Sequence, residues 1–146
     1  MRLFLLLLFP VMISLSVNGQ LQDGIIGEWL TGNGKGHIKI ERYGSHFYGK
    51  IVWLKEPLDP ESGKPKTDKN NPADAKKSNP IFGLQMLKNF VYDPEENEWN
   101  EGTIYDPENG KTYSCRIKMK DKNTLDVRGY VGISMLGRSD SWFRIK

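Results

Sequence analysis

The chain has 146 residues, of which 38% are hydrophobic and 27% are charged, and its formal net charge is +3. This composition is typical of a soluble globular protein about one domain long, and it excludes disordered tails, collagens and proteins with many membrane spans. The charge is too small to indicate nucleic-acid binding, and two histidines with one cysteine are too few to predict a catalytic residue, a metal site or a cofactor.

The first segment in chain order has the pattern of an export signal. A methionine and an arginine are followed by the apolar run Leu3–Val17, and small residues come directly after it. The run is shorter than the roughly 20 residues that a membrane-spanning helix needs. The sequence therefore predicts a signal peptide over residues 1–19. Residues 20–146 would then be one exported domain, in the periplasm or outside the cell.

The rest of the chain consists mainly of short segments in which apolar and polar residues alternate, as in strands with one buried face. The clearest is Thr112–Lys120, where every second residue from Tyr113 to Met119 is apolar. Lys35–Leu54 has the pattern of a hairpin. Further strands are predicted at Ile26–Thr31, Leu84–Tyr92, Glu98–Tyr105, Thr124–Tyr130 and Ser141–Ile145.

Three Asp-Pro-Glu segments have the chemistry of tight turns. In Asp59–Lys64, Asp93–Asn97 and Asp106–Lys111, the aspartate can accept amide hydrogen bonds, and an asparagine or glycine can take the left-handed position. No segment shows a sustained helical period. The sequence predicts an all-β fold, either an antiparallel barrel of about eight strands or a sandwich, and the barrel is favoured because it leaves no exposed edge.

The proline-rich segment over residues 55–80 interrupts this pattern, because it contains five prolines and no sustained apolar run. A connection of this length is typical of a functional flap or of a disordered insert. Its polar residues Asp68, Asn70, Asn71 and Asp74 have two interpretations. They cap the mouth of a barrel, or they form Asx turns that organise an exposed loop.

Several motifs recur together along the chain. They are Gly27-Glu28-Trp29, Asp68–Asp74, Pro80–Leu84, Trp99–Tyr113, Leu125–Gly132, Leu136–Arg138 and Trp142–Arg144. Their order and spacing resemble an exported bacterial family known as domain of unknown function 2147. The resemblance implies a small antiparallel barrel similar to the lipocalin or calycin group, in which Trp29 packs beneath Arg144 and closes one barrel end. It implies no established activity.

Inward aromatic residues in such a barrel either fill a packed core or line a cavity for one small ligand. We predict Trp53, Tyr105 and Tyr113 as candidate lining residues. Arg128 is a candidate anchor for an anionic head group, because a guanidinium offers a fork of donors. The alternative for Arg128 is a surface ion pair, for example with Asp126.

The sequence thus favours an exported, monomeric protein that binds a small lipophilic or amphipathic molecule. The alternative is a ligand-free module whose long loop or basic face contacts a protein. Residues 111–146 carry nine basic and three acidic side chains. The basic side chains either attract an anionic envelope surface or are simply hydrated on an exposed strand face. An enzyme ranks third, since it needs an inward acid or base with a shifted pKa.

Overall fold

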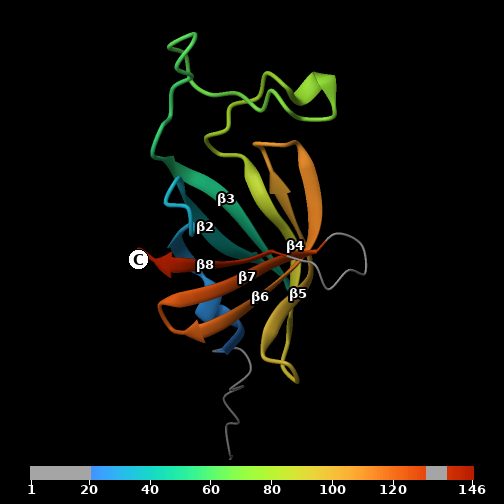
Figure 1. Cartoon of the computed structure of the whole chain (residues 1–146). Helices are drawn as coiled ribbons and strands as arrows, with labels where there is room; N and C mark the ends of the chain where they lie inside the picture. Colours follow the sequence, from blue (N-terminus) through green and yellow to red (C-terminus); the bar gives the residue numbers. More distant parts are fainter. Residues whose placement is uncertain (1–20, 131–137) are drawn as a thin grey trace, which may run out of the picture.

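A computed structural model of the chain describes residues 21–130 and 138–146. These residues form a closed barrel of antiparallel strands in which each strand pairs with the next and β1 pairs with β8. Figure 1 shows the barrel, with the long connection between β3 and β4 above it. The elements are η1 (Asp23–Ile25), β1 (Gly27–Leu30), β2 (Gly36–Tyr43), β3 (His46–Leu54), η2 (Asp74–Lys76), β4 (Gln85–Asp93), β5 (Glu98–Asp106), β6 (Lys111–Asp121), β7 (Thr124–Tyr130) and β8 (Arg138–Arg144).

The predicted all-β barrel of about eight strands is confirmed. The segment predicted at Thr124–Tyr130 coincides with β7, whereas β8 begins at Arg138 rather than at Ser141. The predicted signal peptide lies outside the described residues, and so does part of the C-terminal motif, over 131–137. Within the described part of the chain, no helix combines the length and the apolar character needed to cross a bilayer.

Strand alternation produces the core, because successive side chains of a strand point to opposite faces. On β6 and β7 the inward residues Cys115, Ile117, Leu125 and Val127 are all buried. Burying one large apolar side chain of this kind stabilises the fold by roughly 1.5 to 3 kcal/mol. The largest buried side chains are Trp29, Trp99, Trp142, Phe47 and Phe90.

The barrel wall contains β-bulges, which bend strands and change the direction of the side chains that follow. The register between β2 and β3 shifts between His37 and Ile38. Asn89 on β4 and Glu101 on β5 have φ angles of 62° and 59°, next to further register shifts. These irregularities reverse the simple inward and outward alternation at several positions.

The three predicted aspartate turns are confirmed. Asp59, Asp93 and Asp106 each accept, through Oδ1, the amide N–H two residues later, at 2.9, 3.0 and 2.9 Å. The backbone amides that bond Asp59 hold the pKa of that carboxyl below its usual value, the amide of Ser62 having the largest effect. The left-handed positions are taken by Gly63, Asn97 and Gly110.

The long connection between β3 and β4 has local structure of its own. Two short antiparallel bridges pair Leu58 with Pro65 and Thr67 with Pro80. The segment also contains η2 and returns to the barrel where the amide of Gly83 donates to the carbonyl of Ile51 at 2.8 Å. The connection is therefore folded onto the barrel end.

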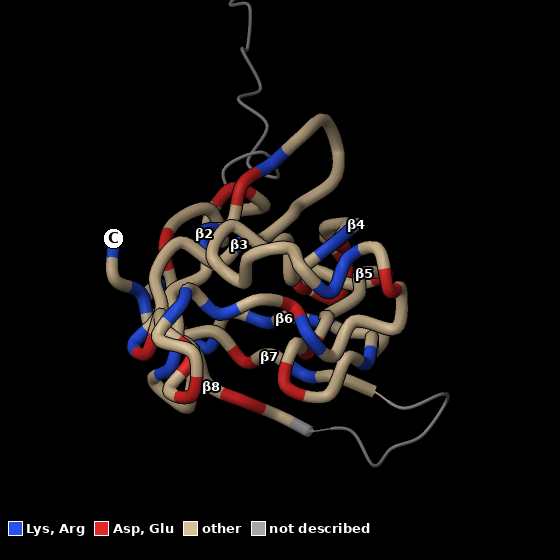
Figure 2. The backbone as a smooth tube through the Cα atoms, turned by 90° about the horizontal axis from the view of Figure 1, so that it is seen from above, with Lys and Arg blue, Asp and Glu red and all other residues tan. Residues whose placement is uncertain are grey.

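Basic and acidic residues are interspersed along the chain around the barrel rather than gathered in separate parts of it (Figure 2). On the outer face of β6, Lys118 lies 3.6 Å from Glu98, and Lys120 donates to the hydroxyl of Ser141 at 2.8 Å. Part of the predicted basic face is thus paired within the protein.

Candidate functional site

The barrel interior is closed at the end where η1 lies. Trp29 is fully buried, and its indole N–H donates to the carbonyl of Ile25 at 2.9 Å. Trp99 donates to the carbonyl of Gln22 at 3.2 Å. A buried indole N–H needs an acceptor, so these two bonds hold the segment before β1 across the barrel end.

Arg144 covers Trp29 at this closed end. Its guanidinium carbon lies 4.2 Å from the centre of the indole ring. The same group donates to the carbonyls of Gly24 at 2.7 Å, Ile26 at 3.1 Å and Lys122 at 2.7 Å, and burial lowers its pKa from the usual value. The contact expected between Trp29 and Arg144 is present, and its role is structural.

The middle of the barrel is filled by large side chains packed against glycines. A Cβ on Gly102 would overlap the ring of Phe90. A Cβ on Gly49 would lie 2.8 Å from Leu87 and 2.9 Å from Ile38, closer than carbon atoms approach. The described interior at this level is therefore core.

The inner face is more open at the opposite end, beneath the long connection. Ile117 and Val127, further inside, are 1% and 3% exposed, whereas Ile104 and Tyr113 are only half-buried. A Cβ on Gly129 would make ordinary 3.6 Å contacts there. We call this region the mouth and define it by Leu54, Leu84, Ile104, Tyr113 and Asp140.

Asp140 places a carboxylate at the mouth. It alternates with buried Trp142 on β8 and therefore faces inward, yet the residue is exposed. Its Oδ2 accepts the indole N–H of Trp142 at 2.9 Å and the amide N–H of Gly32 at 3.2 Å. A Cβ on Gly32 would overlap the carboxylate, so a glycine is required for this approach. These contacts fix the orientation of the carboxylate.

A buried hydrogen-bond network joins the long connection to the outside of β5. The hydroxyl of Tyr105 donates to Oδ1 of Asp68 at 2.7 Å, and the side-chain amide of Asn71 donates to Oδ2 at 2.8 Å. Burial, followed by the bond to Asp68, raises the pKa of Tyr105 to about 12. Tyr105 therefore remains a neutral donor at physiological pH. Asp68 therefore anchors the connection to the barrel, whereas the Asx-turn interpretation holds for Asn71, whose Oδ1 accepts the amide N–H of Ala73 at 2.9 Å.

A second contact holds the same connection over the turn between β5 and β6. The side-chain amide of Asn70 donates to the carbonyls of Pro107 and Glu108, each at 3.0 Å. Lys35, in the loop between β1 and β2, lies 2.8 Å from the Glu108 carboxylate. Three connections are thus linked around the mouth.

Of the three predicted lining residues, only Tyr113 faces the interior at the mouth. Trp53 lies outside because the bulge beside Ile38 pairs it with outward-facing His37, whose ring centre is 4.3 Å from the indole. Tyr105 alternates with inward Ile104 and is buried by the long connection instead.

Arg128 also lies on the outer face, which corrects its expected position as an inward anchor. Its neighbours Leu125 and Val127 occupy the inner face of β7. Arg128 is instead the strand partner of Arg116. The guanidinium carbons of Arg128 and Arg116 lie 5.4 and 5.5 Å from the centre of the Tyr130 ring. Arg128 therefore lies on the outer face, as the alternative interpretation requires, and its ion pair with Asp126 stays a prediction.

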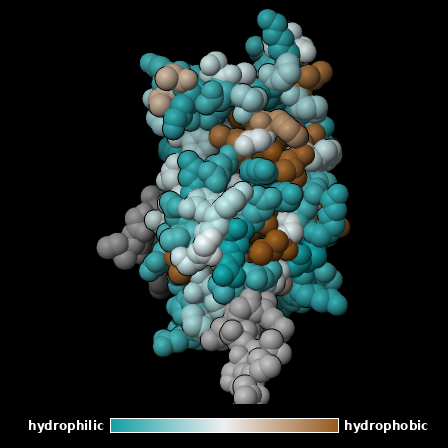
Figure 3. Space-filling view, turned by 180° about the vertical axis from the view of Figure 1, so that it is seen from behind, coloured by the Kyte–Doolittle hydropathy of each residue, from teal (hydrophilic) through white to brown (hydrophobic). Residues whose placement is uncertain are grey.

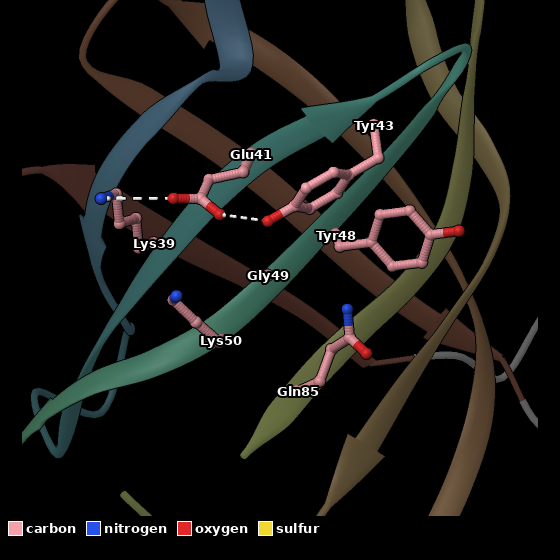
Figure 4. A pocket seen from close by; sticks show the side chains of 7 residues that line it. All are labelled: Lys39, Glu41, Tyr43, Tyr48, Gly49, Lys50 and Gln85. Atoms are coloured by element: carbon pink, nitrogen blue, oxygen red, sulfur yellow. Dashed lines mark hydrogen bonds and ion pairs between the residues drawn. The ribbon is translucent and has the colours of Figure 1, made fainter. Parts of the chain in front are cut away.

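A small hollow lies on the outer face of β2, β3 and β4 (Figure 4). Its volume is about 40 Å³, far below the roughly 300 Å³ at which small-molecule pockets begin. Glu41 lies between Lys39, at 3.2 Å, and the Tyr43 hydroxyl, at 2.9 Å. The hydrogen bond from Tyr43, together with that from Lys39, lowers the pKa of Glu41. This hollow accommodates water rather than an amphipathic ligand.

Sequence reasoning missed Asp140, although a signal for it was present. The predicted last strand began at Ser141, so Asp140 fell outside the alternation. Extending the strand backwards would have placed Asp140 on the face of Trp142 and Arg144.

Comparison with known proteins agrees with this architecture. The family described as an uncharacterized protein conserved in bacteria, domain of unknown function 2147, matches residues 27–144. A solved structure of a protein from Helicobacter pylori, described as belonging to the lipocalin family, is similar with a TM-score of 0.69 and 21% identity, covering 83% of this chain and 82% of that chain. No curated protein matches the chain. The chain therefore belongs to this bacterial family of unknown function and has a lipocalin-like fold.

Proposed function

We propose that the protein binds one small amphipathic molecule at the mouth of its barrel. The observation that supports this proposal is the change in exposure along the inner face, from buried Ile117 to half-buried Tyr113. Half-buried apolar residues beside a fixed polar group are typical of ligand sites. The lipocalin-like fold is consistent with such a site, since small barrels hold either a packed core or one ligand.

The ligand would enter only the outer part of the barrel. Phe90 and Trp142 are buried below the mouth, and Gly102 leaves no space beside Phe90. An apolar group of the ligand would contact Ile104 and Tyr113, while its polar end would remain near the solvent. This arrangement favours small molecules with a short apolar part.

The test is a titration with phenylnaphthylamine, a neutral amphipathic dye whose fluorescence rises in apolar surroundings. Gly129→Val adds a side chain at the mouth, and Ser114→Val makes a matched change on the outer face of β6. We expect saturable binding of one dye per protein, at least tenfold weaker in Gly129→Val and unchanged in Ser114→Val. Circular dichroism checks that both variants fold. Absence of saturable binding, or equal weakening in both variants, would contradict the proposal.

A second candidate function is a protein-interaction module. The face hidden in Figure 1 is largely hydrophilic, but hydrophobic side chains gather on it below the long connection (Figure 3). Leu58 and Phe82 of the connection are 53% and 62% exposed, and exposed apolar residues on an anchored loop are typical of protein contacts. Capture of a partner by the intact protein, abolished by Leu58→Ser with Phe82→Ser, would favour this function. Capture that persists in the double variant would contradict it.

We further propose that the protein is exported, with residues 1–19 removed as a signal peptide. This proposal rests on the positive start and the apolar run of the sequence. N-terminal sequencing of the exported protein should begin at Gln20. Recovery of a chain that begins at Met1 from the membrane fraction would contradict it.

A further inference from the structure

We propose that the mouth selects amphipathic molecules with a positively charged head group, and that Asp140 binds this group. The inference rests on the proposed function and specifies the chemical class of the ligand. The proposed head group is cationic, whereas the sequence led us to expect an anionic one. The reason is that Arg128 lies on the outer face and Asp140 on the inner face.

Asp140 is accessible because the barrel wall is incomplete beside it. β1 pairs with β8 only at Trp29 with Arg144 and at Leu30 with Phe143. Beyond Leu30 the chain leaves β8 and turns into the loop before β2, and the amide of Gly32 contacts the Asp140 side chain instead of the β8 backbone. The carboxylate therefore bridges β8 and this loop, at the level of the mouth.

The contacts of Asp140 leave one oxygen for a ligand. Both of its hydrogen bonds, from Trp142 and Gly32, are accepted by Oδ2. Among the side chains that the structure describes, in residues 21–130 and 139–146, no hydrogen bond reaches Oδ1, and no lysine, arginine or histidine forms an ion pair with the carboxylate. The negative charge is thus held in place by two donors and has no ion-pair partner among these described residues.

The surroundings strengthen binding of a cation at this position. Hydrogen bonds between an ammonium group and a carboxylate are stronger than those between neutral groups. Asp140 is itself exposed, so the ion pair alone would be weak, and the half-buried apolar residues of the mouth would supply the rest of the affinity by contacting the apolar part of the ligand. An anionic head group would be repelled by the same carboxylate. The site therefore discriminates by charge as well as by apolar contact.

The experiment compares three molecules with the same ten-carbon chain, namely decyltrimethylammonium, decanol and decanoate, each displacing phenylnaphthylamine below its micelle concentration. Asp140→Asn removes the charge but keeps an oxygen that can accept from Trp142 and Gly32. Asp126→Asn is the matched control, because it makes the same charge change on the outer face of β7, where Asp126 is the strand partner of Lys118. Near-ultraviolet circular dichroism verifies the fold of both variants.

We expect the native protein to bind decyltrimethylammonium at least tenfold more tightly than decanoate. Asp140→Asn should remove most of this preference while changing decanol binding less than twofold, and Asp126→Asn should leave the preference intact. The inference would be overturned if the native protein bound decyltrimethylammonium and decanoate equally, or if the two variants had equal effects. Saturable binding of the neutral dye would still support the proposed function in that case. Failure of the dye and of decanol to bind the native protein would overturn the proposed function itself.

Discussion

The guanidinium carbon of Arg144 lies 4.2 Å from the centre of the Trp29 indole ring, and the two residues are also strand partners in the short ladder between β1 and β8. One side chain therefore combines a cation–π contact with hydrogen bonds to carbonyls of two separate segments. A planar guanidinium suits this geometry, whereas a lysine ammonium lacks the fork of donors.

Replacement of Arg144 should weaken the fold. Arg144→Ala is expected to lower the free energy of unfolding by about 1 to 3 kcal/mol, because the indole is uncovered and three carbonyls lose their donor. Arg144→Lys should fall between this variant and the native protein. Urea unfolding measures the effect, and Lys88→Ala at an exposed position should stay within about 0.5 kcal/mol. An Arg144→Ala protein as stable as the control would remove the structural role.

The packing of Phe90 against Gly102 predicts a non-additive pair of substitutions. Gly102→Ala should destabilise the protein by about 1 to 3 kcal/mol, because the new Cβ overlaps the ring. Phe90→Ala alone should cost about 3 kcal/mol or more through the cavity that it leaves. The double variant should be more stable than the sum of the two losses predicts, by about 1 kcal/mol. Strict additivity in chemical unfolding would show that the two groups do not compete for space.

The bond between Tyr105 and Asp68 should anchor the long connection. Tyr105→Phe removes one hydrogen bond to a charged acceptor and should lower the free energy of unfolding by roughly 1.5 to 3 kcal/mol. The same variant should be cleaved faster by trypsin, which cuts after lysine, within residues 55–84. Tyr48→Phe is a suitable control, since its hydroxyl bonds to Asn89 at the surface of the barrel. Unchanged cleavage in Tyr105→Phe would mean that other contacts suffice to hold the connection.

The raised pKa of Tyr105 gives this anchor a defined pH dependence. The folded state holds the phenol proton up to a pKa of about 12, against 10.0 for an unperturbed tyrosine. The stabilisation is therefore complete below about pH 10 and is lost as the pH rises through about 12. The stability difference between the native protein and Tyr105→Phe should narrow over this interval. A difference that stays constant up to pH 12 would contradict the assignment.

Cys115 should be chemically inert in the folded protein. Its side chain is 4% exposed, and burial raises the pKa of the thiol to about 12, so that almost no reactive thiolate forms near neutral pH. Ellman's reagent at pH 8 should label the thiol only after unfolding. A Cys115→Ser, Ser114→Cys protein moves the thiol to the exposed neighbouring position and should react at once. Rapid labelling of the native protein would show that this part of the wall opens.

Much of the barrel follows from the period-two pattern of the sequence. Cys115 and Ile117 alternate with polar residues on β6, and their burial follows directly from that pattern. The aspartate turns were equally predictable, because the hydrogen bonds of Asp59, Asp93 and Asp106 involve only residues nearby in the chain. Local chemistry was sufficient in both cases.

The candidate site was less predictable because it depends on irregular and distant features. One bulge turns Trp53 to the outer face, and no residue type in that stretch marks the bulge. Tyr105 is buried by Asp68, a residue from another connection. The position of Asp140 depends on where β1 ends relative to β8, which is a relationship between the two ends of the fold.

The short ladder between β1 and β8 has a consequence for folding kinetics. All other strand pairs join neighbours in the sequence, so each closes with a smaller loss of chain entropy than β1 onto β8, even across the long connection between β3 and β4. Closing β1 onto β8 requires the two ends of the barrel to meet, and the ladder offsets that loss with only two pairs of strand residues and the backbone bonds of Glu28 to Ile145 and Lys146. We therefore expect closure after the rate-limiting transition state, with Arg144→Ala accelerating unfolding and leaving the refolding rate nearly unchanged.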